Sequence, residues 1–298
     1  MTLNLVLNSN NVVSGSNNSR YAYSFIGNTN INILDEAEMC ISNITIPYSW
    51  FNFTKAYGNN KFTFQFPQGG TSIVLVLTIP DGFYTIDDIN ALFQQFCINN
   101  GLYLINTSGQ YVYYMVFMYN PATYGIQLIC SLVPLTLPSG WTAPVGWVFP
   151  TGVTRCPQLV LQSSDGTFNK MIGFAYGTYP VSNFANYNVV STLVPVGSIV
   201  NSLICRCSLV NNNVGFPSDV LDTIPITSTF GSNINYSPPA LKWVKMSSGN
   251  YQKLEILFVD QNLNSINILD SNVCISLLIN NKGKEIVETF IPKLAFRD

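Results

Sequence analysis

The sequence predicts a mainly β protein, built as a sandwich or barrel of many short strands. Three observations support this class. Short apolar or alternating runs bounded by Gly, Pro, Asn and Ser recur along the 298 residues, with no internal repeat of fixed period. Only one segment carries complete start and stop signals for a helix. The charged fraction is 9%, against roughly 25% in a typical soluble domain, so the surface must be mostly uncharged and polar.

The first strands follow a polar N-terminal segment. Residues 1–19 are rich in Asn and Ser, and we expect a flexible arm there. Strand-like runs then cover residues 20–26 and 38–47. The apolar phase of the second run shifts near Ser42, which indicates a β-bulge.

A hairpin and a helix come next. Residues 61–66 place three Phe on one face, and after a Pro-Gln-Gly-Gly turn residues 72–80 are apolar on both faces, so they predict a hairpin with an interior strand. The helix is expected at about 85–99, because Thr85 is a good N-cap, Asp88 can complete a capping box and Asn-Asn-Gly follows. Its apolar stripe consists of Ile86, Ile89, Leu92, Phe93 and Phe96.

Strand patterns resume after the helix and continue to the C-terminal region. The expected strands lie within residues 101–107, 111–120, 124–133, 201–210, 219–227, 251–260, 265–270 and 272–280. Between them, residues 134–157 form a long loop rich in Pro, Gly and Trp, of a length that is usually functional or exposed to a partner. Residues 167–174 predict a helical turn that ends at Gly173.

Composition excludes several classes of function. The chain contains no histidine, which removes Ser-His-Asp and Cys-His nucleophiles and His-ligated zinc. A net charge of −2 without a Lys/Arg cluster argues against nucleic-acid binding.

No run is long enough to span a membrane and no signal peptide is recognisable, so we expect synthesis in the cytosol. We therefore expect the seven cysteines to be reduced and mostly buried. The scarcity of charge has two explanations that remain open: a surface packed against neighbours, or the residue usage of an AT-rich genome.

Motifs that could carry chemistry have simpler structural explanations. "DQNLN" at 260–264 resembles the start of a calcium loop, but Ser265 and Ser271 replace the required Gly and Glu, so we expect a turn. Cys205 and Cys207 alternate on a strand and should face the core.

Carboxylates are few, and no pattern pairs them in a cleft. Asp87 and Asp88 would repel an anion from the start of the helix, so we interpret this helix as architecture. We therefore assign no catalytic, cofactor-binding or metal-ligating residue, expect no cofactor, and interpret the protein as not an enzyme.

An ordered set of motifs resembles a known family. The segments are "AEMCISNITIPYSWFNFT", "NNKFTFQF", "LTIPDGFYTIDDINALFQQF", "NKMIGF", "SLICRCSLVNNNVGFPSDVLDTIPI" and "LEILFVDQNLNSINILDSNVCISLLI". In this order, over roughly residues 20–280, they resemble the penton (minor capsid) proteins of virophages and Polinton-like viruses.

This resemblance implies a single jelly-roll β-sandwich with an inserted α+β subdomain that carries the helix. We place the jelly-roll at residues 20–56 and 181–298 and the insertion at 57–180. The resemblance further implies a homopentamer at the icosahedral vertices of a virophage-like dsDNA virus, surrounded by a double-jelly-roll major capsid protein and assembled in the host cytoplasm.

An alternative function is a virion attachment protein or a lectin-like carbohydrate-binding module. This alternative is compatible with a penton whose insertion contacts a host receptor. Trp141, Trp147 and Phe149 in the long loop motivate it, because aromatic rings can stack on sugars. The simpler interpretation is that these rings fold back over a local core.

Overall fold

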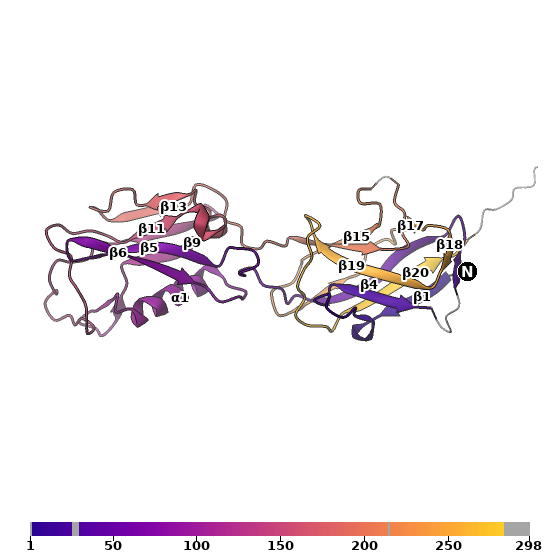
Figure 1. Cartoon of the computed structure of the whole chain (residues 1–298), viewed down its shortest axis with the longest axis horizontal. Coiled ribbons are helices and arrows are strands. Elements are labelled where there is room, and N and C mark those ends of the chain that lie inside the picture. The colour runs from indigo at the N-terminus through magenta and orange to yellow at the C-terminus, as the bar shows by residue number, and fades with distance from the viewer. Residues whose placement is uncertain (1, 26–29, 214, 283–298) are drawn as a thin grey trace, which may run out of the picture. The chain divides into compact units, whose positions relative to one another are not determined.

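The computed structural model describes residues 2–25, 30–213 and 215–282, and the chain divides into two compact units (Figure 1). Unit 1 combines Met1–Trp50 with Val200–Asp298, and unit 2 is Phe51–Ile199. Both units consist mainly of antiparallel strands, as the sequence predicted. Each unit has its own sheets and its own buried residues.

Unit 1 contains two main sheets. The first has the order β1 (Thr2–Leu7), β20 (Cys274–Asn280), β4 (Glu38–Pro47) and β16 (Asn233–Tyr236), with β17 (Val244–Lys245) also paired to β4. The second has the order β15 (Val220–Pro225), β14 (Ser202–Cys207), β19 (Lys253–Asp260) and β2 (Arg20–Ser24). A short ladder joins β3 (Ile31–Ile33) to β18 (Gly249–Tyr251).

The strand order of unit 1 defines its topology. Along the chain, the eight main strands are β1, β2, β4, β14, β15, β16, β19 and β20. The first pairs with the eighth, the second with the seventh, the third with the sixth and the fourth with the fifth. Nested antiparallel pairing of this kind, distributed over two sheets, is the jelly-roll arrangement. Unit 2 is inserted between the third and fourth of these strands.

Alternation of side chains builds the unit 1 core. Inward-facing residues of both sheets are almost completely buried, among them Leu7, Tyr21, Met39, Ile44, Cys205, Phe258, Ile275 and Leu277. The bulge predicted at Ser42 is confirmed, because Ser276 pairs with Asn43 and Leu277 with Ile41, which leaves Ser42 as the extra residue. Its hydroxyl donates to the carbonyl oxygen of Ser276 at 3.1 Å.

A polar network with the buried Asp222 at its centre connects the two sheets. The Asp222 carboxylate of β15 accepts hydrogen bonds from the Tyr236 hydroxyl of β16 at 2.6 Å and from Lys242 Nζ at 2.8 Å. The bond to Asp222 raises the pKa of Lys242, and burial together with Asp222 raises the pKa of Tyr236. Asp222 is only 8% exposed, so this pairing satisfies a charge that would otherwise be costly to bury.

Two expectations about the domain plan need correction. Residues 2–7, assigned to a flexible arm, form β1, because Leu5 and Leu7 alternate inward and the strand pairs with β20 along its length. The second unit spans 51–199, whereas we expected an insertion at 57–180, because Phe53 and Ile199 near its two ends pack with the unit 2 core. Residues 283–298, which we assigned to the jelly-roll, lie outside the described part of the chain.

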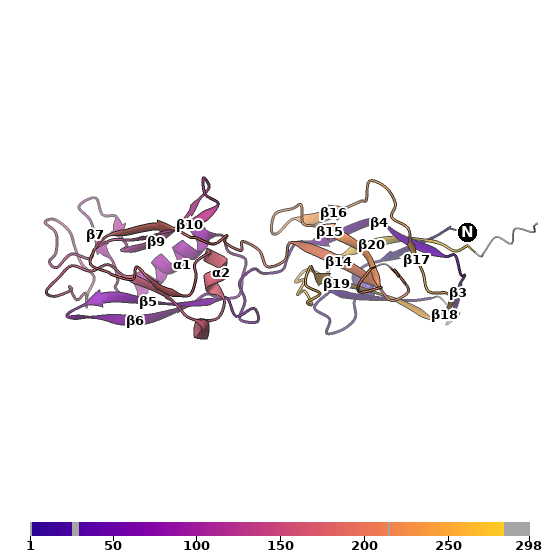
Figure 2. The ribbon, with the colours of Figure 1, turned by 90° about the horizontal axis from the view of Figure 1, so that it is seen from above.

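Unit 2 contains two main sheets, a short two-stranded ladder, two α-helices and a 3-10 turn at Ser163–Asp165. The larger sheet has the order β12 (Gly177–Tyr179), β11 (Gln158–Leu161), β5 (Lys61–Gln68) and β6 (Thr71–Thr78). The smaller has the order β13 (Tyr187–Val190), β10 (Gly125–Cys130) and β9 (Met115–Asn120), and β7 (Leu104–Ile105) pairs with β8 (Tyr111–Val112). In Figure 2 the β5–β6 hairpin lies on one side of this unit and the β9–β10 hairpin on the other.

The predicted helix is confirmed as α1 (Ile86–Asn99). Thr85 and Asp88 form the expected capping box, with Asp88 N donating to Thr85 Oγ1 at 3.2 Å and Thr85 N donating to Asp88 Oδ2 at 2.8 Å. The apolar stripe packs against both sheets. The Phe93 ring lies 5.1 Å from Phe64 of β5 and 5.9 Å from Phe117 of β9, measured between centroids. The helix therefore closes an aromatic core, as its stripe predicted.

The second helix is the predicted turn. α2 (Phe168–Ile172) ends at Gly173, which has the left-handed φ of 73°. Phe168 stacks on Phe62 of β5 with centroids 4.6 Å apart. This contact attaches α2 to the same aromatic core.

Candidate functional site

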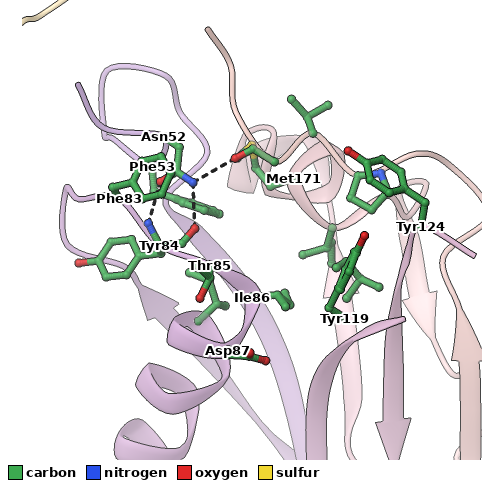
Figure 3. Close-up of a pocket in the computed structure, with 16 residues that line it drawn as sticks. Asn52, Phe53, Phe83, Tyr84, Thr85, Ile86, Asp87, Tyr119, Tyr124 and Met171 are labelled. Atoms are coloured by element: carbon green, nitrogen blue, oxygen red, sulfur yellow. Dashed lines mark hydrogen bonds between the residues drawn. The ribbon is translucent and has the colours of Figure 1, made fainter. Parts of the chain in front are cut away.

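A cavity of unit 2 lies beside the start of α1. It has a volume of about 390 Å³. Separate segments form its wall: the turn before α1 and the first turn of the helix, the loop at 52–53, α2, the tips of β9 and β10, and residues 195–197 (Figure 3). A concave site of this size is typical of pockets for small ligands.

Asn52 fixes the upper wall of this pocket. Its side-chain amide donates to the carbonyl oxygens of Tyr84 and Gly197, at 2.9 and 3.2 Å, and its Oδ1 accepts from the Tyr84 N–H at 2.9 Å (Figure 3). These bonds use both amide hydrogens and the oxygen. Asn52 is only 3% exposed, so it holds the wall together and is not available to a ligand.

Two tyrosines form the opposite rim. Tyr119 at the end of β9 and Tyr124 before β10 are 44% and 64% exposed, and their rings meet edge to face with centroids 6.3 Å apart. Tyr124 has a φ of 50°, in the left-handed region that bulky residues seldom adopt. Gly or Asn would take this turn position at lower cost. The strained backbone therefore places an aromatic ring at the rim of the pocket.

The charge of the pocket comes from one carboxylate. Asp87 is the only charged side chain among the described residues that line it, and in Figure 3 it points from α1 toward Tyr119. The neighbouring Asp88 is engaged in the capping box, and its hydrogen bonds with Thr85 hold its pKa below the ordinary value. Ion pairs in the described part of the chain involve other carboxylates.

The outer faces of the two unit 1 sheets differ in charge. On the first sheet, the outward positions of β1, β20 and β16 carry uncharged residues, including Asn4, Val6, Ser276 and Asn235, and charge occurs at the end of the sheet where Glu38 of β4 pairs with Lys245 of β17. On the second sheet, Arg20, Lys253, Glu255 and Arg206 occupy outward positions of β2, β19 and β14. Interface centres are depleted of charge, which makes the first face the better candidate for a permanent contact.

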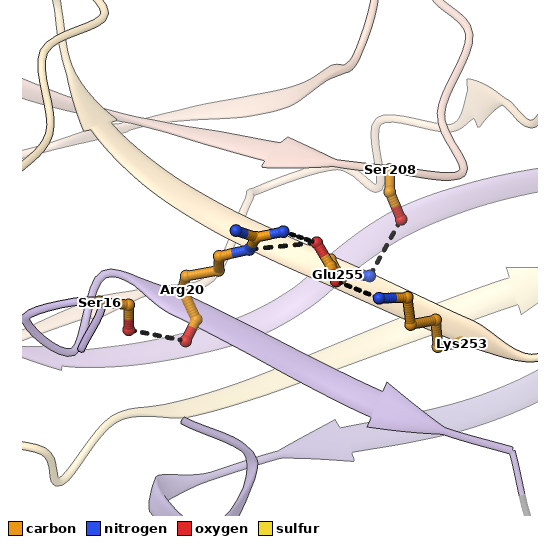
Figure 4. Close-up of polar contacts among 5 residues, drawn as sticks. All are labelled: Ser16, Arg20, Ser208, Lys253 and Glu255. Carbon is orange, nitrogen blue, oxygen red and sulfur yellow. Dashed lines mark hydrogen bonds and ion pairs between the residues drawn. The ribbon is translucent and has the colours of Figure 1, made fainter. Parts of the chain in front are cut away.

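The charges on the second face are paired with one another. Glu255 accepts from the Arg20 guanidinium and from Lys253 Nζ, the latter at 2.8 Å, while its backbone N–H donates to Ser208 Oγ at 3.0 Å (Figure 4). The Lys253 and Arg20 bonds lower the pKa of the Glu255 carboxyl. Arg206 binds Asp219 with two bonds of 2.9 Å each. This face is a solvated, ion-paired surface.

The loop aromatics considered for sugar stacking pack on the unit 2 core. Trp141, Trp147 and Phe149 are each half-buried. The Trp147 ring lies 5.8 Å from Phe66 and 5.7 Å from Phe149, between centroids. The rings fold back over the local core and form no flat exposed platform.

The cysteines and the calcium-like motif have structural roles. Cys205 and Cys207 are buried, as predicted, and burial raises the pKa of Cys207 to about 12, which keeps its thiol protonated and unreactive. Six of the seven cysteines are buried, as expected, and Cys274 is exposed because it occupies an outward position on β20. Asp260 accepts from the backbone N–H groups of Asn262 and Asn264, each at 2.8 Å, and thereby closes the predicted turn.

No group of three or more His, Cys, Asp or Glu side chains in the described part of the chain could hold a metal ion. No helix there has the length and apolar character that crossing a membrane requires.

Sequence reasoning missed the pocket at α1. It recognised the helix start and the acidic Asp87, but the pocket needs Tyr119, Tyr124 and α2 beside that start. These segments come together only through tertiary packing. The one local signal was Tyr124 in the turn "NPATYG", a bulky residue where a turn usually has Gly or Asn.

The strand order thus defines unit 1 as a jelly-roll that carries a second, inserted unit between its third and fourth strands. Among solved structures, the chain is similar to the mavirus penton protein, with 12% identity, a TM-score of 0.46, and coverage of 95% of this chain and 99% of the other. It is also similar to a chain in the structure of the Sputnik virophage, with 13% identity, a TM-score of 0.43, and coverage of 94% and 98%. No protein-family model matches the sequence, and comparison with curated proteins found no relative.

Proposed function

We propose that this chain is a structural capsid protein, which forms the homopentameric penton at the vertices of a virophage-like dsDNA virus. The observation that carries the proposal is the nested strand pairing of unit 1, because the jelly-roll recurs in capsid proteins. The same architecture also occurs in lectins and cupins, so the fold alone does not decide the function.

The chemistry of the chain favours a capsid role among these jelly-roll functions. A jelly-roll site that holds a metal through histidine is excluded, because this chain contains no histidine. The aromatic residues considered for sugar stacking are packed on the unit 2 core. The sequence has no charged residue between Asp88 and Arg155. The apolar side chains of Val145, Val181 and Phe184 are exposed in unit 2. Such a surface suits contacts with other proteins.

The ordered motif set supports the more specific assignment. The segments that resemble penton proteins coincide with β4, β5, α1, α2, β14 and the β19–β20 region, which are the framework of both units. On this proposal the partners are further copies of this chain and a double-jelly-roll major capsid protein. The protein would be part of the virion and would assemble in the host cytoplasm.

Reconstruction of the particle tests the proposal directly. We expect density for the two units of this chain at the fivefold vertices, with five copies in a ring. Another protein at those positions, with this chain on the facets, would contradict the penton assignment. Absence of the chain from purified particles would contradict the capsid role as well.

A pair of matched variants tests how the copies assemble. Ser276 on β20 and Ala22 on β2 are half-buried small residues at outward positions of the two different sheets. We expect Ser276→Lys to reduce incorporation into particles, because it introduces a charge beside Val6 and Asn43, in the uncharged part of the first face. Ala22→Lys should be tolerated, since Glu255 lies opposite it in the ladder. Equal incorporation of both variants would exclude the part of the first face around Ser276 as a contact.

A further inference from the structure

The polar groups that the unit 2 pocket offers to a ligand are few. The Asn52 amide is saturated by Tyr84 and Gly197, and the Thr85 hydroxyl is bound to Asp88. The wall is otherwise mostly apolar, with Phe53, Ile86, Ile126, Met171 and Ile172 among its residues. Available groups are therefore the Asp87 carboxylate and the hydroxyls and ring faces of Tyr119 and Tyr124.

These groups select a ligand by charge. Without a Lys or Arg in the described lining, a phosphate, sulfate or carboxylate would be repelled by Asp87, whose full negative charge outweighs the partial positive charge at the start of α1. A sugar needs several converging donors and acceptors, and the amide that could supply them is already bonded. An ammonium group with alkyl substituents matches all three features, because aromatic faces attract cations, the carboxylate neutralises the charge and the apolar wall contacts the alkyl groups.

We propose that this pocket binds an organic cation with an alkylated ammonium group. Asp87 supplies the counter-charge from the first turn of α1, and the rings of Tyr119 and Tyr124 supply the cation–π surface. The left-handed backbone of Tyr124 holds that ring at the rim of the pocket. The inference goes beyond the capsid role and does not depend on it.

Choline is the direct probe, and 3,3-dimethylbutan-1-ol is its neutral counterpart of the same shape. Binding of each to the full chain is measured by saturation-transfer NMR and by calorimetric titration. We expect choline to bind about tenfold more tightly than the neutral alcohol, because only the cation interacts with Asp87 and the aromatic faces. Equal binding of the two, or no binding of choline, would overturn the proposal.

Two variants locate the site. Asp87→Asn should weaken choline binding about tenfold and leave the neutral alcohol unaffected. Asp35→Asn, at an exposed carboxylate of unit 1, is the matched control and should change neither. Unchanged choline affinity in Asp87→Asn would overturn the proposal.

Tyr124→Gly separates ligand binding from folding. The variant should keep or raise the unfolding midpoint, because Gly relieves the left-handed backbone, while choline binding falls. Tyr111→Leu, at a tyrosine 49% exposed elsewhere in unit 2, is its control and should bind choline normally. A stable Tyr124→Gly protein with unchanged affinity would contradict the role of the ring.

A final arm distinguishes the source of the ammonium group. Co-sedimentation with phosphatidylcholine vesicles that free choline reverses would identify a lipid headgroup as ligand. Binding of free choline without co-sedimentation would identify a small soluble cation. Both outcomes support the pocket chemistry, whereas co-sedimentation that also occurs with phosphatidylglycerol vesicles and is insensitive to choline would count against it.

Discussion

The two units of this chain contain similar numbers of strands, but different interactions stabilise them. In unit 1 the strands pair in the nested antiparallel order of a jelly-roll, and polar groups around the buried Asp222 connect the sheets. Unit 1 also contains most of the ion pairs of the described residues. Unit 2 contains only eight charged residues, and clusters of Phe rings hold its two sheets together. The difference shows that a β-rich fold can be specified either by strand topology with polar ties or by a large aromatic core.

The first prediction is that the two units unfold independently of each other. Phe93 is 1% exposed within the unit 2 core, and Phe258 is completely buried in unit 1. Truncation of a buried Phe costs about 3–5 kcal/mol. We expect Phe93→Ala to lower the unfolding midpoint of unit 2 alone and Phe258→Ala that of unit 1 alone, measured by hydrogen exchange resolved along the chain. Loss of protection in both units from either variant would show that they unfold as one.

The second prediction uses two glycines of unit 2 with similar backbone angles. Gly166 has a φ of 88° and a Cβ there would lie 1.8 Å from the carbonyl oxygen of Gly58, whereas Gly152 has a φ of 83° with nothing within 4 Å. Gly166→Ala should destabilise unit 2 by more than about 2 kcal/mol, because a carbonyl must move in addition to the backbone strain. Gly152→Ala should cost about 1 kcal/mol, from the left-handed conformation alone.

Chemical denaturation of the two glycine variants checks this comparison. Equal destabilisation would mean that the Gly58–Gly166 approach contributes nothing beyond backbone conformation. A larger loss of stability in Gly166→Ala would show that the close backbone contact between Gly58 and Gly166 contributes to the stability of unit 2.

Local signals predicted much of this fold. The capping box of Thr85 and Asp88, the bulge at Ser42 and the helix end at Gly173 are each encoded within a few residues, and all three are confirmed. The position of β1 was not predicted, because its short alternating pattern is embedded in Asn- and Ser-rich sequence and its partner β20 is far away along the chain. Long-range pairing of this kind has no local signature.

The candidate pocket was predicted least. Asp87 was recognised as a charge at the helix start, but its neighbours across the cavity come from separate segments. One sequence contains no periodicity that links Tyr119 to Asp87, so only the structure could bring them together. Residues of a site assembled from loops remain outside what hydrophobic patterns can predict.

The third prediction concerns the helix cap of unit 2. Thr85→Ala removes the hydroxyl that accepts from Asp88 N and donates to its carboxylate. We expect a loss of about 1 kcal/mol in the stability of unit 2. Thr85→Ser retains the hydroxyl and should be nearly neutral, which distinguishes the cap bond from the loss of the methyl group. A Thr85→Ser variant as unstable as Thr85→Ala would contradict this explanation.

The smallest expected effect concerns pH and unit 1. Lys253 and Arg20 hold the pKa of folded Glu255 below its ordinary value of 4.5, so the carboxylate contributes stability above that value and the contribution is lost as the pH falls through the folded pKa. Because the three side chains are partly exposed, the effect should stay below about 1 kcal/mol.

Glu255→Gln isolates this contribution. The unfolding midpoint of unit 1, followed from about pH 6 to about pH 3, should fall less steeply in Glu255→Gln than in the unmodified chain. Asp35→Asn, at an exposed carboxylate without an ion pair in the described part of the chain, should retain the original slope. Unit 2 should show no difference among the three proteins. If Glu255→Gln also changed the pH dependence of the unfolding midpoint of unit 2, the stabilities of the two units would not be independent.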